Sequence, residues 1–203
     1  SLIVKREAAD SSRGSLVRRY LSREATLLQR VEVDAVRGTG AVFCVSERER
    51  AHFAAIGGSN VHLVPNGVDC SRYAELPIGR AGSKPMILFV GALSWPPNAA
   101  AARVLAQDVL RLVQARIPGA ALTIVGRDPG PDTNALSGIA GVTVAGNVPD
   151  ILPYLRNASL LAVPLAAGGG TRLKILEAFA AGLPVVSTAI GAEGIDAVNG
   201  RDI

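Results

Sequence analysis

The 203-residue chain has little cysteine, few aromatic residues and no long apolar run. Two cysteines exclude a disulfide-rich scaffold and a zinc module built on several cysteines. No apolar run reaches the roughly 18 residues that a membrane-spanning helix needs. No long apolar stretch follows Lys5 and Arg6, so we expect no signal peptide. These absences favour a cytoplasmic α/β protein as the starting hypothesis.

The formal net charge is +4, and the first 50 residues hold ten Lys/Arg against seven Asp/Glu. A basic face near an anionic membrane or a nucleic acid is one interpretation. The other is an ordinary solvated helix, which the alternating signs favour. No aromatic side chains are interleaved with the basic ones, so we expect no nucleic-acid partner. The Arg- and Ala-rich composition points to a bacterial protein.

Apolar residues make up 49% of the chain, which is enough to offset the entropy of folding and excludes disorder. Short apolar runs alternate with helical patterns, as in a parallel sheet covered on both faces. The pattern therefore predicts an α/β fold with a doubly wound parallel sheet. Strands are expected at 41–45, 61–64, 86–90, 121–125, 142–144, 160–163 and 184–187. Helices are expected at 15–36, from Ser46 in a capping box with Glu49, from Asn98 to about 118, at 150–157 and at 171–181.

A Pro-, Gly- and Ser-containing segment at 66–85 is predicted to be a linker between two units. The first unit, with two strands in about 65 residues, is too small for a complete doubly wound domain. We therefore expect it to be part of a larger domain.

Glycine-containing turns follow three of the predicted strands, at Gly91, Gly126 and Gly168–Gly170. In open parallel sheets, ligands bind beyond the carboxyl ends of the strands. The triplet lets backbone N–H groups approach an anion, and the helix that follows adds its positive dipole end. Arg172 and Lys174 fall in the first turn of that predicted helix, where cations oppose the dipole unless an anion binds. The pattern favours a diphosphate site, and a plain solvated helix start is the simpler alternative.

Glu177 lies three residues after Lys174 on the same predicted helix. One interpretation is an i, i+3 ion pair worth roughly 0.2–0.5 kcal/mol. The other is a carboxylate that accepts hydrogen bonds from sugar hydroxyls, since a carboxylate is acceptor-only and suits a ribose diol. The residues alone leave both open.

The segment 164–186 (PLAAGGGTRLKILEAFAAGLPVV) resembles the donor-site segment of retaining GT-B glycosyltransferases of family 4, or group 1. Three stretches agree with it: 61–69 (VHLVPNGVD), 89–98 (FVGALSWPPN) and 144–152 (VAGNVPDIL). The resemblance implies a Rossmann-like GT-B C-terminal domain at 66–203, truncated at its C-terminus, that binds a nucleotide-sugar donor. It implies that residues 1–65 are the remnant of an acceptor-binding N-terminal domain with a partial Rossmann-like unit.

The resemblance also implies a role for individual residues along the donor. Arg172 and Lys174 match the helix start beside the diphosphate and would stabilise it as a leaving group. Glu177 matches the second Glu of the family's Glu-x7-Glu motif, which binds the ribose. The further donor-binding positions that it implies are Gly91, Asn98, Asn147, Val148, Asp150, Gly169, Gly170 and Thr171.

The sequence departs from the family pattern at two places. Gly169 stands where the first Glu of the Glu-x7-Glu motif would fall, so backbone N–H groups would have to replace its sugar contacts. The loop 91–98 lacks the Arg and Lys that many relatives carry there, so the diphosphate charge would rest more on Arg172 and Lys174. Both departures favour a second hypothesis, a catalytically degenerate nucleotide-sugar-binding or interaction module.

The resemblance implies transfer of a sugar from a nucleoside diphosphate sugar, with retention, to an unknown acceptor that is a saccharide or lipid-linked. We expect this fragment to be inactive by itself. No Asp-x-Asp triplet occurs, so no metal and no other cofactor is expected. A nicotinamide dehydrogenase would need Gly-x-Gly-x-x-Gly after a strand, and only Gly91 is found there. Peripheral association with the inner face of the membrane is an open alternative to a purely cytoplasmic location.

Overall fold

The computed structural model of the chain describes residues 15–74, 84–168 and 170–203. Contacts divide these residues into two units, which are described separately. The first unit runs up to Asn66 and includes 167–171 and 193–195, and the second holds 67–166, 172–192 and 196–203. The roles that the family resemblance assigns to residues 1–65 and 66–203 stay predictions.

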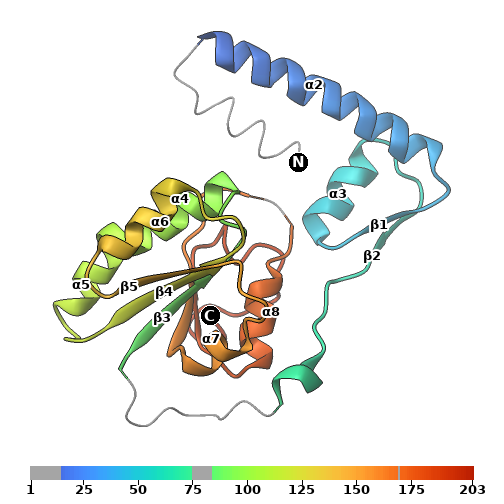
Figure 1. Ribbon diagram of the computed structural model, residues 1–203. Coiled ribbons are helices and arrows are strands. Elements are labelled where there is room, and N and C mark those ends of the chain that lie inside the picture. The colour runs from blue at the N-terminus through green and yellow to red at the C-terminus, as the bar shows by residue number, and fades with distance from the viewer. Residues whose placement is uncertain (1–14, 75–83, 169) are drawn as a thin grey trace. The chain divides into compact units, whose positions relative to one another are not determined.

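The second unit is built on a five-stranded sheet with the order β5-β4-β3-β6-β7 (Figure 1). Every neighbouring pair is parallel, which confirms the predicted α/β fold with a parallel sheet. The edge strand β5 extends to Gly146, two residues beyond the prediction, because it pairs with β4 over its whole length. The strands are β3 Met86–Val90, β4 Ala121–Gly126, β5 Val142–Gly146, β6 Leu160–Val163 and β7 Val185–Ser187.

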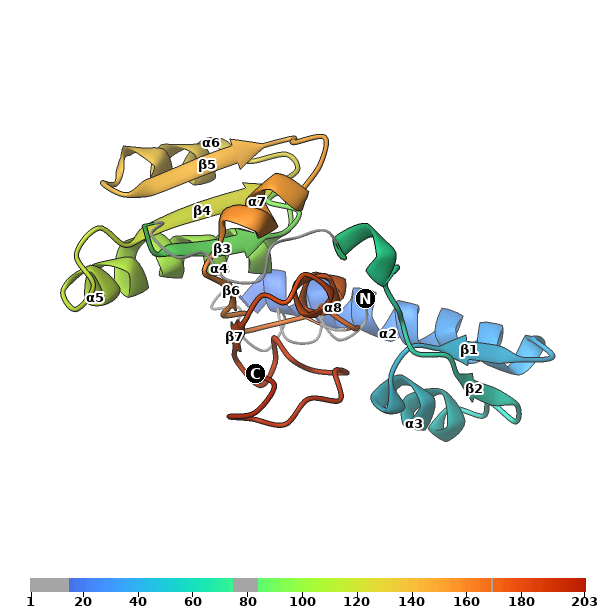
Figure 2. The same ribbon diagram turned by 90° about the horizontal axis from the view of Figure 1, so that it is seen from below.

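Helices cover both faces of this sheet (Figures 1 and 2). Those that follow β3 and β4 lie on one face, and those that follow β5 and β6 lie on the other, as right-handed crossovers require. The first group is α4 Pro96–Val104, a π-helical segment η2 Leu105–Val109, α5 Leu110–Gln114, α6 Pro131–Asn134 and the 3₁₀ segment η3 Ala135–Gly138. The second group is α7 Leu152–Asn157 and α8 Leu173–Ala180.

The middle strand β3 supplies the centre of the hydrophobic core. Ile87, Leu88 and Phe89 are all buried, and the last two have no exposed surface. This explains the unbroken apolar run, because a central strand covered on both faces has no solvent side. Each fully buried side chain of this kind contributes about 1.5–3 kcal/mol. The strand therefore gives the residues that follow it a rigid base.

Three predicted helix starts are displaced by two residues, including that of α7, which begins at Leu152 instead of at 150. The helix after β3 begins at Pro96 instead of Asn98, because proline suits the first helical position and its missing N–H costs nothing there. The helix after β6 begins at Leu173 instead of Thr171, because Arg172 has non-helical angles, φ −88° and ψ 89°. Helix α6 begins at Pro131, and the sequence pattern did not indicate a helix there.

The segment 66–85, predicted to be a linker, contains a structured turn, and its role as a linker stays a prediction. Residues Cys70–Tyr73 form the 3₁₀ helix η1. Asp69 caps it, since its Oδ1 accepts hydrogen bonds from Ser71 N at 3.0 Å and from Ser71 Oγ at 2.6 Å. A helix this short has no apolar periodicity for sequence reasoning to detect. The linker residues 75–83 lie outside the described residues.

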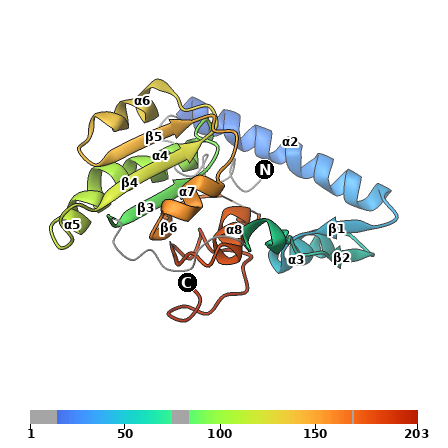
Figure 3. The same ribbon diagram turned by 60° about the horizontal axis from the view of Figure 1, so that its bottom comes forward.

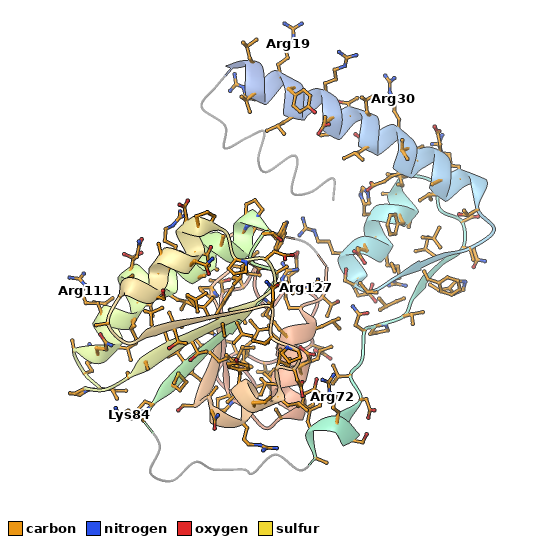
Figure 4. All side chains as sticks on the ribbon, in the orientation of Figure 1. Arg19, Arg30, Arg72, Lys84, Arg111 and Arg127 are labelled. Carbon is orange, nitrogen blue, oxygen red and sulfur yellow. The ribbon has the colours of Figure 1, made fainter. Side chains whose placement is uncertain are left out.

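The first unit consists of α2 Ser15–Gly38, β1 Val42–Cys44, α3 Glu47–Ala55 and β2 Val61–Leu63. Its two strands are parallel. The predicted capping box is confirmed in a variant form: Ser46 Oγ accepts from Glu49 N at 3.3 Å, and Glu49 Oε2 accepts from Val45 N at 3.0 Å. Arg19 and Arg30 project from α2 (Figure 4). No helix in the described parts of the chain is long and apolar enough to cross a membrane.

Candidate functional site

The second unit has one topological switch point, between the neighbouring strands β3 and β6. From β3 the chain proceeds to β4 and β5 on one side, whereas β6 leads to β7 on the other. In doubly wound sheets, ligands bind outside the carboxyl ends of the strands at such a point. Helices α4 and α8 are the helices that follow these two strands. We therefore expect a ligand site at the first turns of α4 and α8.

Asn98 in the first turn of α4 is buried, with 6% of its surface exposed. Its Nδ2 donates a hydrogen bond to the carbonyl oxygen of Ala92 at 2.9 Å, which fixes the loop after β3. A Cβ at Gly91 would lie 2.7 Å from this Nδ2, and a Cβ at Gly126 would overlap the carbonyl oxygen of Gly91. Close packing thus requires glycine at both positions. Their predicted approach to a ligand stays a prediction.

Lys174 in the first turn of α8 reaches across to α4. Its Nζ donates to Asn98 Oδ1 at 3.3 Å and lies 4.8 Å from the centre of the Phe89 ring. Burial lowers the pKa of Lys174 to about 8; the positive charge of Arg172 adds to this effect, and Glu177 opposes it. An ammonium group that has lost part of its hydration gains strongly from a nearby anion. Both of its contacts are with neutral groups, so its charge is not cancelled.

Lys174 and Glu177 do not form the i, i+3 ion pair that the sequence left open. Within 4.0 Å, neither residue takes part in any ion pair of the described chain. That simpler interpretation is therefore wrong for this helix. The ion pairs found are Arg48–Glu193, Arg50–Glu47, His52–Glu32, Arg72–Asp150 and Arg201–Asp202.

Arg172 occupies the N-cap position of α8 and is 7% exposed. The prediction placed it inside the first turn, whereas it directly precedes that turn. A buried guanidinium is unusual, because removing this charge from water is costly. Two basic residues, Arg172 and Lys174, thus stand at a helix start that has no acidic residue in its first turn. The helix dipole alone would disfavour this arrangement.

Glu177 lies one turn farther along α8 and contacts a residue that sequence reasoning missed. The Tyr73 hydroxyl donates a hydrogen bond to Glu177 Oε1 at 3.2 Å. Tyr73 is 4% exposed, and burial together with the Glu177 carboxylate raises the pKa of its hydroxyl. The phenol therefore stays protonated and can donate at any physiological pH. In the sequence, the one signal for Tyr73 is its position a few residues after the turn Pro65-Asn66-Gly67, which does not indicate the contact with Glu177.

The residues predicted to lie along a nucleobase follow β5. Asn147 has a positive φ of 54°, and its Oδ1 accepts from Asp128 N at 3.0 Å. Asp150 Oδ1 accepts from Leu152 N at 3.2 Å and pairs with Arg72 Nη2 at 2.8 Å. Val148 lies between them and is partly exposed. Asn147 and Asp150 thus shape the local backbone, and their contact with a base stays a prediction.

The glycine-rich loop belongs to the first unit, so the site above is built from residues of the second unit alone. Gly168 and Gly170 have φ values of 136° and 78°, which only glycine adopts without strain. Thr171 Oγ1 donates to the carbonyl oxygen of Val45 at 3.3 Å, and Gly169 lies outside the described residues. The predicted donor contacts of Gly169, Gly170 and Thr171 stay predictions.

Another hollow of the second unit lies near the opposite end of α8. It has a volume of about 580 Å³, and its only basic side chain, Arg201, is paired with Asp202 at 2.8 Å. It therefore suits an anion poorly. In the described part of the chain, no three His, Cys, Asp or Glu residues are grouped so that they could hold a metal ion. The expectation that no metal or cofactor is needed stays a prediction.

Residues 84–202 match the family of glycosyl transferases group 1. A phosphatidyl-myo-inositol mannosyltransferase of Mycolicibacterium smegmatis is 31% identical over 141 residues, which are 66% of this chain and 36% of that protein. The chain thus spans about a third of this relative's length.

Two solved structures have the same fold at low sequence identity. One is Anabaena Alr3699/HepE in complex with UDP-glucose, with a TM-score of 0.60, 20% identity and coverage of 82% of this chain and 49% of that one. The other is WaaG, a glycosyltransferase involved in lipopolysaccharide biosynthesis, with a TM-score of 0.60, 19% identity and coverage of 91% and 53%. Both likenesses support a Rossmann-like sheet in this chain.

Proposed function

This chain belongs to the group 1 glycosyl transferases, and we propose that its second unit binds the nucleoside diphosphate of a sugar donor at the start of α8. The observation that carries this proposal is Lys174, a partly desolvated cation at the switch point whose contacts are an amide oxygen and an aromatic ring. The likeness to a structure that contains UDP-glucose supports the same class of ligand. A diphosphate would supply the direct anionic partner that Lys174 lacks among its contacts, which are an amide oxygen and an aromatic ring.

In the proposed reaction, the bond between the anomeric carbon of the sugar and the β-phosphate oxygen breaks. A bond to the acceptor oxygen forms on the same face of the sugar, and the acceptor hydroxyl passes its proton to the departing phosphate oxygen. Lys174 and Arg172 stabilise the negative charge that grows on the departing diphosphate. Groups held in place before the reaction, in a site of low dielectric constant, stabilise such charge most effectively. The transfer itself is proposed for a protein of the relatives' full length, of which this chain spans about a third in the mannosyltransferase.

The other proposed contacts follow the donor from the phosphates to the base. Glu177 accepts hydrogen bonds from the ribose diol. Backbone groups of Gly91, Gly169 and Gly170, with Thr171, approach the phosphates and the sugar. Asn147, Val148 and Asp150 border the base, and Asn98 orients Lys174 toward the diphosphate.

The acceptor is proposed from the relatives alone. One relative is named for a phosphatidyl-myo-inositol substrate, and a structural neighbour takes part in lipopolysaccharide biosynthesis. A lipid-linked or saccharide acceptor is therefore proposed, together with peripheral association at a membrane surface. A binding module without transferase activity is the second candidate, and the observation in its favour is Gly169 in place of the motif's first Glu.

Calorimetric titration of the chain with UDP, GDP and ADP tests the proposal. We expect at least one of them to bind, and Lys174→Met to weaken it by about 10- to 100-fold, the usual value of a hydrogen bond to a charged group. Arg172→Met should act in the same direction.

The matched controls are Lys84→Met and Arg111→Met, which remove exposed charges of the same unit (Figure 4). These two variants should leave the affinity unchanged. If Lys174→Met binds the nucleotide as well as the unmodified chain does, the assigned role of Lys174 is wrong.

A further inference from the structure

The short helix η1 makes contacts with two of the acidic residues that the proposed site uses. Tyr73 at its end donates to Glu177 on α8, and Arg72 pairs with Asp150 at the start of α7. Figure 3 shows η1, coloured dark green, directly beside α8. Its own N-terminus is held by the Asp69 cap. A helix of only four residues is thus fixed at both ends.

The two contacts of η1 differ in strength. The Arg72 and Asp150 side chains keep 54% and 40% of their surface exposed, so this pair is a surface ion pair of small effect. The Tyr73 ring is almost fully buried, which fixes the position of its hydroxyl relative to α8. A buried hydroxyl without a partner is unfavourable, and Glu177 is the acceptor that satisfies it. The phenol therefore holds the carboxylate in one orientation.

The hydrogen bond leaves most of the carboxylate free for a ligand. An ionised carboxylate has about four lone-pair sites on two oxygens, and Tyr73 occupies one of them on Oε1. No other side chain of the described residues donates to Glu177. The carboxylate is partly exposed, so a donor from solution can reach it. Two hydroxyls on neighbouring carbons would match its two oxygens.

We propose that Tyr73 is a positioning residue, which orients the Glu177 carboxylate toward the 2′- and 3′-hydroxyls of the nucleotide's ribose. This inference rests on the proposed function, because it requires a nucleoside diphosphate at α8. It assigns to η1 of the second unit a part in ligand specificity, since a phenylalanine at position 73 would fill the same space without the hydrogen bond. The effect of Tyr73 should therefore be confined to the ribose.

The test compares two ligands, a nucleoside diphosphate that binds the chain and its 2′,3′-dideoxy analogue. Affinities for both are measured by calorimetry for the unmodified chain, Tyr73→Phe, Glu177→Gln and the double variant. We expect Tyr73→Phe to reduce the preference for the ribose form by about three- to tenfold, the usual value of one hydrogen bond. The affinity for the dideoxy form should not change. The double variant should lose no more of the preference than Glu177→Gln alone.

Tyr154→Phe is the matched control, because Tyr154 lies on α7 in the same unit and its hydroxyl makes no hydrogen bond with the described residues. It should leave both affinities unchanged. Arg72→Met is a second variant on η1 and should reduce the preference by less than Tyr73→Phe does.

Different results overturn the inference and the proposed function. Binding that Tyr73→Phe leaves unchanged, or weakens equally for both ligands, would overturn the role of Tyr73 alone. A chain that binds none of the nucleoside diphosphates would overturn the proposed function, and the inference with it.

Discussion

Lys174 and Glu177 lie one turn apart on α8, and their surroundings are opposite in kind. The lysine contacts an amide oxygen and an aromatic ring, and neither of these neutralises its charge. The carboxylate contacts a phenol that donates one hydrogen bond and leaves its other lone pairs available. An ion pair between the two would be worth only a few tenths of a kcal/mol, and the helix does not form it.

The surroundings of Lys174 and Glu177 would bind different chemical groups of one ligand. The region of Lys174 requires negative charge, whereas the region of Glu177 requires hydrogen-bond donors. Surface residues of the same unit behave differently: Arg72 and Asp150 pair directly with each other and satisfy both charges. A nucleotide offers both, because it joins an anionic diphosphate to a ribose whose hydroxyls donate hydrogen bonds.

Reversing the charge of Lys174 should have the largest effect of the changes considered, because it removes the cation that distinguishes this region from that of Glu177. Lys174→Glu would place a second carboxylate beside Glu177 and repel the diphosphate. We expect nucleotide affinity to fall by more than about 100-fold, because an attraction is replaced by a repulsion. Calorimetry measures the loss, and Lys84→Glu serves as the control with the same change of net charge. Equal affinities of the two variants would remove Lys174 from the site.

Displacing Asn98, the hydrogen-bond partner of Lys174, should have a smaller effect, mainly on the free energy of unfolding. Gly91→Ala places a Cβ 2.7 Å from Asn98 Nδ2, and Asn98 also holds Lys174. We expect a loss of about 1–3 kcal/mol in the free energy of unfolding, the usual value for overpacking a buried site. Urea denaturation measures this loss. Gly138→Ala is the control, because a Cβ at Gly138 meets no atom within 4 Å. A loss as small as that of the control would show that Asn98 can move freely.

Lys174 should also make the free energy of unfolding depend on pH, and we expect this effect to be the smallest. Its pKa in the folded chain is about 8, below the ordinary value of 10.5. Between these values the unfolded chain binds more protons, so stability should rise with pH from about 8 to 10.5 through this residue. Below pH 8 the buried charge is fully present, and its cost is greatest. Urea denaturation at several pH values should show that Lys174→Met lacks this rise, whereas Lys84→Met retains it.

The fold of the second unit could be predicted almost entirely from the sequence. Its strands are unbroken apolar runs such as Met86–Val90, which only a sheet covered on both faces buries completely. The helix starts were less predictable, because local backbone angles decide them: Arg172 is non-helical, and Pro96 is helical. Element type follows from a pattern over many residues, whereas an element's first residue depends on one or two.

The candidate site was predictable in its charges and less so in its partners. Arg172, Lys174 and Glu177 could be selected because cations at a helix start need an explanation. Tyr73 and the interaction of Asn98 with Lys174 could not, since they join residues 104 and 76 positions apart. Such contacts depend on where the sheet places α4, α8 and η1. Only the structure shows that the lysine and the carboxylate have separate neutral partners.

The most direct test of the central claim is the number of protons taken up when the nucleoside diphosphate binds. Calorimetric titrations at pH 8.5, in buffers of different ionisation enthalpy, measure this number. If a partly neutral Lys174 meets the diphosphate, its pKa must rise on binding, and the unmodified chain should take up as much as roughly 0.8 proton. Lys174→Met should take up close to none. Binding without proton uptake by the unmodified chain, or equal uptake by the variant, would contradict the claim that the diphosphate meets a partly desolvated Lys174 and raises its pKa.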